Sequence, residues 1–179
     1  RSSVVSHAKT LGYEVSSPRA PIAVINVGLS TSASTKTMPA GTAFTSVVDG
    51  TDYQFVTIAD VTASNTGSTV PFDSVNIYEG TYITTRYTVD TSDVDQRFIL
   101  GDSNADSGLY EIYFGDGTVS KSISDGNIVI LQYVVTNKSL ANGANTFSSP
   151  TSIDSVTSVT VTSVSGAVGG AESESIDSI

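Results

Sequence analysis

The sequence contains no cysteine and a single histidine, His7. The absence of cysteine excludes disulfide bonds and thiolate metal sites. Because there is one histidine and no thiol, the usual dyads of a catalytic nucleophile and its base are nearly excluded as well. His7 lies in residues 2–14, which have helical apolar spacing, and a solitary histidine there is usually a surface or packing residue. We therefore predict no catalytic histidine.

Positive charge is also scarce, with 8 Lys and Arg against 18 Asp and Glu, which gives a formal net charge of −10. The basic residues are spread singly along the chain, so we expect no nucleic-acid partner. Long apolar runs are lacking, since none approaches the roughly 20 residues that cross a bilayer. The first segment has no apolar stretch of the kind that a secretory signal contains, so we expect no signal and no membrane partner.

The residues that are abundant favour strands. Ser and Thr replace much of the missing charge, and together with Val, Ile and Tyr they suit half-buried sheet surfaces. From Pro39 onward, short apolar stretches alternate with Gly-containing turns, which is typical of antiparallel sheets. We predict a mainly β fold: an antiparallel β-sandwich or barrel-like domain, or two small β subdomains, with short helices at both ends.

The predicted organisation has four parts. Residues 1–19 form an N-terminal helix and linker from a preceding region, 20–92 a first β region, 93–165 a second β region, and 166–179 the start of a C-terminal helical region. Acidic residues after Gly169-Gly170 suit the first turn of that last helix. Since the chain opens at Arg1 without Met and stops within a helix-like pattern, we expect it to be part of a longer protein.

Four segments within these parts carry specific predictions. The pattern APIAVINVGLS (20–30) predicts a strand and TSASTKTM (31–38) a polar linker, while Asp49-Gly50-Thr51-Asp52 predicts a hairpin turn. The run IVILQYVVT (128–136) is apolar on both faces, which favours a central, buried strand.

Candidate acidic sites are interpreted as turns. Asp102, Asn104 and Asp106 are spaced two apart, as in a calcium loop, but position twelve of that loop is Tyr113, where a bidentate Glu is required. A turn rich in Asp, Asn and Ser gives the same pattern through backbone bonding. We therefore predict no metal site, no cofactor and no catalytic residue, although a carboxylate pair stays conceivable among so many acids.

The segment YEIYFGDG (110–117) leads an alternating strand into a Gly-Asp-Gly turn. Glycine relieves the steric cost of positive φ, so Asp116 needs no ligand to explain its place. The same reasoning identifies a structural turn motif, whose residues are Phe114, Gly115, Asp116, Gly117, Asp125, Gly126, Asn142 and Gly143.

The stretch from Tyr110 to Phe147 resembles the baseplate wedge proteins of T4-like contractile-tailed phages, in the wider baseplate-J-like group. The shared elements are IYFGDG, SDGNIVILQYVVTN and ANGANTF. Two earlier segments are similar to that family in the same order: SHAKTLGYEVSSPRAPIAVINV (6–27) and PAGTAFTSVVDGTDYQFVT (39–57). GGAESESIDSI (169–179) resembles the point where the family passes from its β region into a helix.

The resemblance implies a structural component of a phage tail baseplate. Such proteins pair with themselves within an inner ring and contact other wedge proteins. They are not enzymes, need no cofactor and bind no small-molecule substrate. The expected location is the virion tail baseplate, after synthesis in the host cytoplasm.

The residues themselves agree with an assembly role, because exposed strand edges can become docking sites. Five tyrosines could supply interface area, or equally serve as ordinary sheet residues: Tyr78, Tyr82, Tyr87, Tyr110 and Tyr113. The alternative function is a β-sandwich adhesin or carbohydrate-binding module, suggested by the short Ser/Thr-rich strands and the Asp-rich turn. An enzyme, such as a two-carboxylate glycosidase, is the third alternative.

Overall fold

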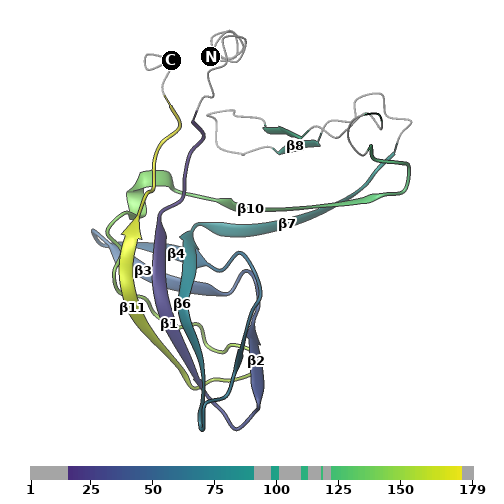
Figure 1. Ribbon diagram of the computed structural model, residues 1–179. Helices are drawn as coiled ribbons and strands as arrows, with labels where there is room; N and C mark the ends of the chain where they lie inside the picture. The colour runs from purple at the N-terminus through teal and green to yellow at the C-terminus, as the bar shows by residue number, and fades with distance from the viewer. Residues whose placement is uncertain (1–15, 91–97, 101–109, 113–117, 119–121, 175–179) are drawn as a thin grey trace. The chain divides into compact units, whose positions relative to one another are not determined.

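The computed structural model describes residues 16–90, 98–100, 110–112, 118 and 122–174 (Figure 1). These residues form a mainly β fold of antiparallel sheets, which confirms the predicted fold class. The only helix within them is a single short 3-10 turn, η1. The predicted N-terminal helix, residues 2–14, lies outside the described residues.

The strands of the described residues have the following bounds in chain order. They are β1 (Ile22–Ser30), β2 (Thr35–Met38), β3 (Ala43–Val48), β4 (Thr51–Val56), β5 (Val61–Ser64), β6 (Thr69–Glu79), β7 (Thr81–Thr88), β8 (Phe98–Leu100), β9 (Tyr110–Ile112), β10 (Ile128–Val135) and β11 (Val159–Val168), with η1 at Lys138–Ala141.

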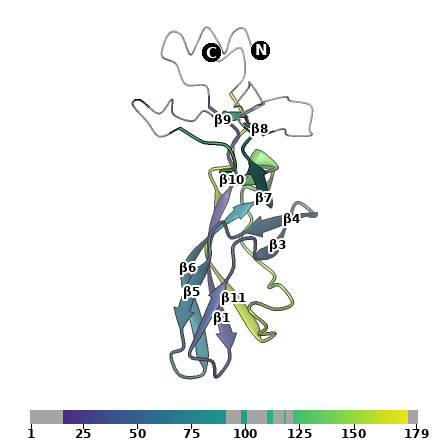
Figure 2. The same cartoon turned by 90° about the vertical axis from the view of Figure 1, so that its right-hand side faces the viewer.

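A five-stranded antiparallel sheet forms the main body, with the strand order β11-β1-β6-β4-β3. Strands β11, β1 and β6 run side by side (Figures 1 and 2). The two edges of this sheet are therefore β11 and β3. Three smaller sheets have two strands each and pair β2 with β5, β7 with β10, and β8 with β9.

The chain divides into two compact units. One comprises Arg1–Tyr82 and Val134–Ile179, and the other comprises Ile83–Tyr133. This division differs from the predicted boundary between residues 92 and 93. The second unit is inserted into the sequence of the first. The prediction places two β regions one after the other, because local patterns do not show where the chain returns to an earlier unit.

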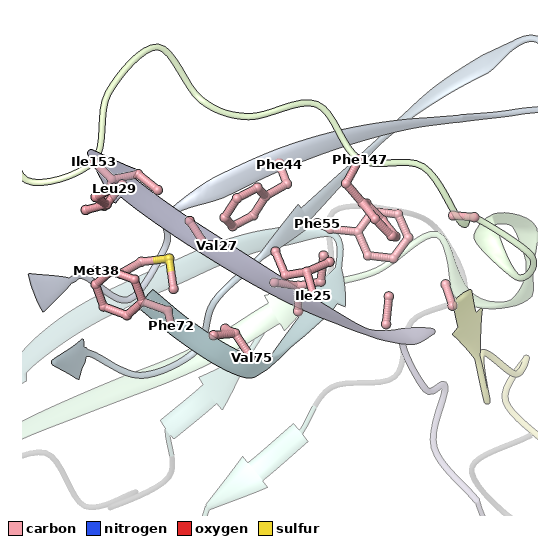
Figure 3. Packing of buried hydrophobic residues seen from close by; sticks show 14 of the residues in the cluster. Ile25, Val27, Leu29, Met38, Phe44, Phe55, Phe72, Val75, Phe147 and Ile153 are labelled. Carbon is pink, nitrogen blue, oxygen red and sulfur yellow. The ribbon is translucent and has the colours of Figure 1, made fainter. Parts of the chain in front are cut away.

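The core of the first unit lies on one face of the five-stranded sheet. Strand β1 alternates buried and partly exposed residues, the period-2 pattern of a strand with one covered face. The sheet contributes Ile25, Phe44 and Phe55 to this core, and β2 and the segment after η1 contribute Met38 and Phe147 (Figure 3). The two-stranded sheet formed by β2 and β5, together with the residues that follow η1, therefore covers that face.

The β3–β4 hairpin forms at the predicted turn, but Thr51 and Asp52 of that predicted turn belong to β4. Its two central residues, Asp49 and Gly50, both have positive φ, at 49° and 78°. That combination belongs to the tight turns whose twist matches antiparallel strands, and Asp and Gly adopt it at low cost. The predicted strand at residues 20–30 also corresponds to β1.

The predicted polar linker at residues 31–38 is wrong in its second half, which forms β2. This strand pairs with β5, and Met38 at its end is fully buried. The polar residues of β2 have partners elsewhere in the chain. The Asp154 carboxylate accepts a hydrogen bond from the Thr37 backbone N–H and forms an ion pair with Lys36. Long-range pairing thus overrides the local composition.

The predicted C-terminal helix is also wrong for the residues that the structure describes. Residues 166–168 belong to β11, and Ala171 forms a two-way backbone bridge with Arg19. Backbone bonding to a segment 152 residues away along the sequence replaces the helix that the acidic pattern suggested. Residues 175–179 lie outside the described residues.

Candidate functional site

A buried carboxylate dominates the polar interior of the first unit. Glu79, at the end of β6, has no solvent exposure. Its Oε2 accepts hydrogen bonds from the Thr136 hydroxyl at 2.6 Å and the Asn137 backbone N–H at 2.8 Å. Its Oε1 accepts from the Asn137 side-chain amide at 2.7 Å. We call these three residues the Glu79 cluster.

Both carboxyl oxygens act as acceptors, which is the pattern of an ionised carboxyl group. None of the three donor groups is a cation, so all three hydrogen bonds come from neutral dipoles. The Thr136 hydroxyl also accepts from the Lys138 backbone N–H at 2.9 Å, which extends the network into η1. These three bonds engage both carboxyl oxygens and give the group a structural role.

The position of the Glu79 cluster explains that role. Glu79 lies just before the chain enters residues 83–133, and Thr136 and Asn137 lie just after it returns. The cluster therefore ties together the two chain segments that flank the inserted unit. The following residue, Gly80, has a φ of 126°, and a Cβ there would lie 2.1 Å from the Val135 carbonyl oxygen. Only glycine permits this close approach.

A second fixed point involves two residues of the predicted turn motif. Asn142 and Gly143 occupy the centre of a turn closed by a bond from the Ala144 N–H to the Ala141 carbonyl, and Gly143 has a φ of 90°. The Asn142 side chain also bonds both the N–H and the C=O of Gly170, at 3.0 and 2.9 Å. This turn holds the end of β11 against η1.

The other predicted turn residues divide into two groups. Asp125 and Gly126 form a turn before β10, in which Gly126 donates its N–H to the Val89 carbonyl and Asn127 donates to Ser124. Phe114, Gly115, Asp116 and Gly117 lie outside the described residues, as do the calcium-like spacing at residues 102–108 and His7.

An ion pair lies on the surface next to the same region. Lys138 contacts Glu172 at 3.0 Å, and the Ser139 hydroxyl donates to the same carboxylate at 3.3 Å. The hydrogen bond from Lys138, followed by its charge and by the contacts to Ser139, lowers the pKa of Glu172 from its ordinary value. Because Glu172 is exposed, water screens this interaction.

The predicted interface tyrosines are mostly half-buried. Tyr78, Tyr82 and Tyr87 are all of this kind, and the Tyr82 hydroxyl is buried without a hydrogen-bond partner. Tyr110 lies in β9, and Tyr113 is outside the described residues. Half-burial fits either role, so their part in an interface stays a prediction.

The largest departure from the predicted burial concerns β10. The sequence favours a central strand, yet β10 pairs with β7 alone among the described strands. Ile130 is 58 % exposed, and Ile128 and Val135 are exposed as well. The prediction of a central, buried strand is wrong for the part of the chain that the structure describes, because no second strand there pairs with β10.

Several further findings concern function. In the described ranges, no three Asp, Glu or His side chains gather closely enough to hold a metal ion, and no helix there has the length and apolar character to span a bilayer. Neither a scan against protein-family models nor a search of curated proteins found a match to this chain.

Proposed function

We propose that this chain is a structural subunit of a contractile-tail baseplate. It acts as a wedge protein that associates with its own copies in the inner ring and contacts other wedge proteins. Two things support the proposal: the ordered resemblance of segments across the chain, and the exposed apolar surface of β10. It requires no substrate, metal or cofactor.

The observation that carries the proposal is the contrast between the sequence of β10 and its surroundings. Seven of the eight residues in IVILQYVV are apolar or aromatic, with Gln132 as the exception. An isolated two-stranded ribbon is marginally stable in water, and fully burying one aliphatic side chain contributes about 1.5–3 kcal/mol. A strand of this composition gains stability when another chain covers it.

The interior of the first unit supports the same role. The Glu79 cluster and the Asn142 turn use buried or specific polar groups to fix chain segments against each other. Such bonds make a rigid scaffold, which an assembly subunit needs in order to keep its surfaces in register. Each of these groups has its partners within the chain.

The test is to purify the full chain and measure its mass by light scattering, alone and after co-expression with the other predicted tail proteins of its genome. The proposal predicts a stable complex that contains this chain. Replacement of Ile130 by Lys should weaken that complex, and replacement of the exposed Ile58 by Lys serves as a control on a loop of the first unit.

A chain that stays monomeric with every tail protein would contradict the proposal. The alternative, a carbohydrate-binding module, predicts binding on a glycan array and stabilisation by calcium. Either response without complex formation would favour that alternative.

A further inference from the structure

The outer edge of β11 has free backbone groups. The Ser30 N–H donates a hydrogen bond to the Ser158 carbonyl. From this pair, the antiparallel pairing of β1 with β11 continues along both strands. Because hydrogen-bonded and non-hydrogen-bonded pairs alternate, the N–H and C=O groups of Val161 and Ser163 point away from β1. No other strand of the described chain pairs with this side.

The free portion has clear limits. Near the end of β11, Ala167 exchanges backbone bonds with Gly143 and Ala144, which cover the edge there. At the start, the Val159 N–H bonds the Thr157 carbonyl. The uncovered edge therefore extends over residues 159–165, with its midpoint at Thr162, and its register against β1 is regular up to Ser163 and shifts between Ser163 and Ser165.

Exposed aliphatic side chains occur on the same strand, among exposed Thr and Ser residues. Val164 is 54 % exposed and Val168 is 68 % exposed on β11, and Ile22, which is opposite Val168 on β1, is exposed as well. Free backbone groups and exposed aliphatic side chains thus occur on the same strand. Proteins usually protect such an edge with Lys, Pro or a bulge. Strand β11 has no Lys or Pro, and its two register shifts against β1 lie after Ser163, so they leave the groups of Val161 and Ser163 in regular register.

Charge is absent from this strand and its flanks. No Asp, Glu, Lys or Arg occurs from residue 155 to residue 171, in a chain whose net charge is −10. The acids that bound this run are each paired within the chain: Asp154 with Lys36 at 3.7 Å, and Glu172 with Lys138 at 3.0 Å. Electrostatic protection of the edge is therefore missing too.

We propose that β11 pairs with β11 of a second copy of this chain, antiparallel and about a twofold axis at Thr162. The inference rests on the proposed function only for the premise that copies associate. Two chains of equal negative charge repel each other, and β11 offers a place where they can approach without bringing unpaired charges together. A partner of opposite charge would gain nothing from this uncharged strand.

The geometry of the strand is self-complementary. With the axis at Thr162, Val161 of one copy lies opposite Ser163 of the other, so the backbone groups that point outward meet each other. Thr162 then faces its own counterpart in a non-hydrogen-bonded pair, where side chains come closest. Two five-stranded sheets would join into one continuous ten-stranded sheet through an isologous contact.

The first experiment blocks the edge without touching the β1 ladder. Ser163→Pro removes an N–H that points outward, the kind of position where edge strands accept proline. Val47→Pro is the matched control: Val47 is 64 % exposed on β3, and its N–H points outward like that of Thr45, which bonds Ser148. Sedimentation velocity over a concentration series of the full chain measures dimerisation, and circular dichroism checks folding.

We expect Ser163→Pro to weaken dimerisation at least about 100-fold, because every copy loses a hydrogen bond and meets a ring at the contact. Val47→Pro should dimerise like the unmodified chain. If Ser163→Pro dimerises as tightly as the unmodified chain, the β11 pairing is overturned, although self-association survives. If the unmodified chain never dimerises, both the pairing and self-association are overturned.

A second experiment does not depend on the proline variant folding. The chain has no cysteine, so Thr162→Cys introduces a unique thiol at the proposed axis. On mild oxidation it should form a disulfide with its own copy, since opposed residues in such pairs have the close Cβ atoms that a disulfide needs. Thr160→Cys and Val164→Cys should link with each other when mixed, but not with themselves. Failure of Thr162→Cys to link in a dimeric sample overturns the pairing.

Discussion

Replacing Glu79 by Leu tests the Glu79 cluster most sharply. The substitution keeps similar volume and removes both acceptors, which leaves the donors of Thr136 and Asn137 without their partner. A hydrogen bond to a charged group contributes about 1.5–3 kcal/mol. Two of the three bonds come from Asn137, which is exposed and can bind water instead, so we expect a net loss of about 3–4 kcal/mol.

The isosteric variant Glu79→Gln separates shape from charge. Its amide oxygen can accept from Thr136 and the Asn137 backbone, and its NH2 group can donate to Asn137 if that side-chain amide flips. We expect a smaller loss, about 1–1.5 kcal/mol, from the missing charge. Urea denaturation followed by circular dichroism measures both losses. A loss below about 1 kcal/mol for Glu79→Leu would refute the proposed role of the cluster.

Glu172 provides a control on the same part of the chain. It is an exposed carboxylate, so Glu172→Gln should leave the free energy of unfolding unchanged within error. Its pKa is lowered in the folded chain by Lys138. Any small stabilisation by this pair is therefore present at neutral pH and is lost as the pH falls through the folded-state pKa. At every salt concentration of a titration at neutral pH, Glu172→Gln and the unmodified chain should have the same free energy of unfolding.

Two further variants test the backbone and the core. Gly80→Ala places a Cβ against the Val135 carbonyl oxygen at positive φ, so we expect a loss of at least about 3 kcal/mol, whereas Gly50→Ala has open space and should cost only about 1 kcal/mol; equal losses in thermal melts would contradict this. Phe55→Ala removes a fully buried ring that meets Phe147 edge-on at 5.0 Å, and should cost about 3–5 kcal/mol. A cost near zero in urea denaturation would show that the core is misassigned.

Local chemistry accounts for the features that the sequence predicts well. The β3–β4 hairpin follows from Asp49 and Gly50, which adopt positive φ where the strands need it. Strand β1 follows from the alternation in residues 20–30. Both depend on neighbours within a few residues, and the mainly β class follows from many such segments together.

The features that sequence reasoning missed depend on distant partners. Glu79 forms its bonds with residues 57 and 58 positions later, and nothing local distinguishes it from a solvated acid before a glycine. The acidic residues after Gly170 resemble a helix start, yet Ala171 bonds to Arg19 instead.

Strand β10 shows a different limit. Its apolar pattern indicates that the strand is buried, but not which molecule buries it. The predicted central strand has one neighbour, β7, within the described chain. The pattern and the structure agree if another chain covers β10, which is the step that leads to an assembly role.

The most direct test of that proposed role is an electron cryo-microscopy reconstruction of a particle assembled from this chain and the tail proteins co-expressed with it. The account predicts that neighbouring chains cover Ile130 of β10 and that β11 lies antiparallel to β11 of another copy. A reconstruction in which both strands face solvent on every copy would contradict it.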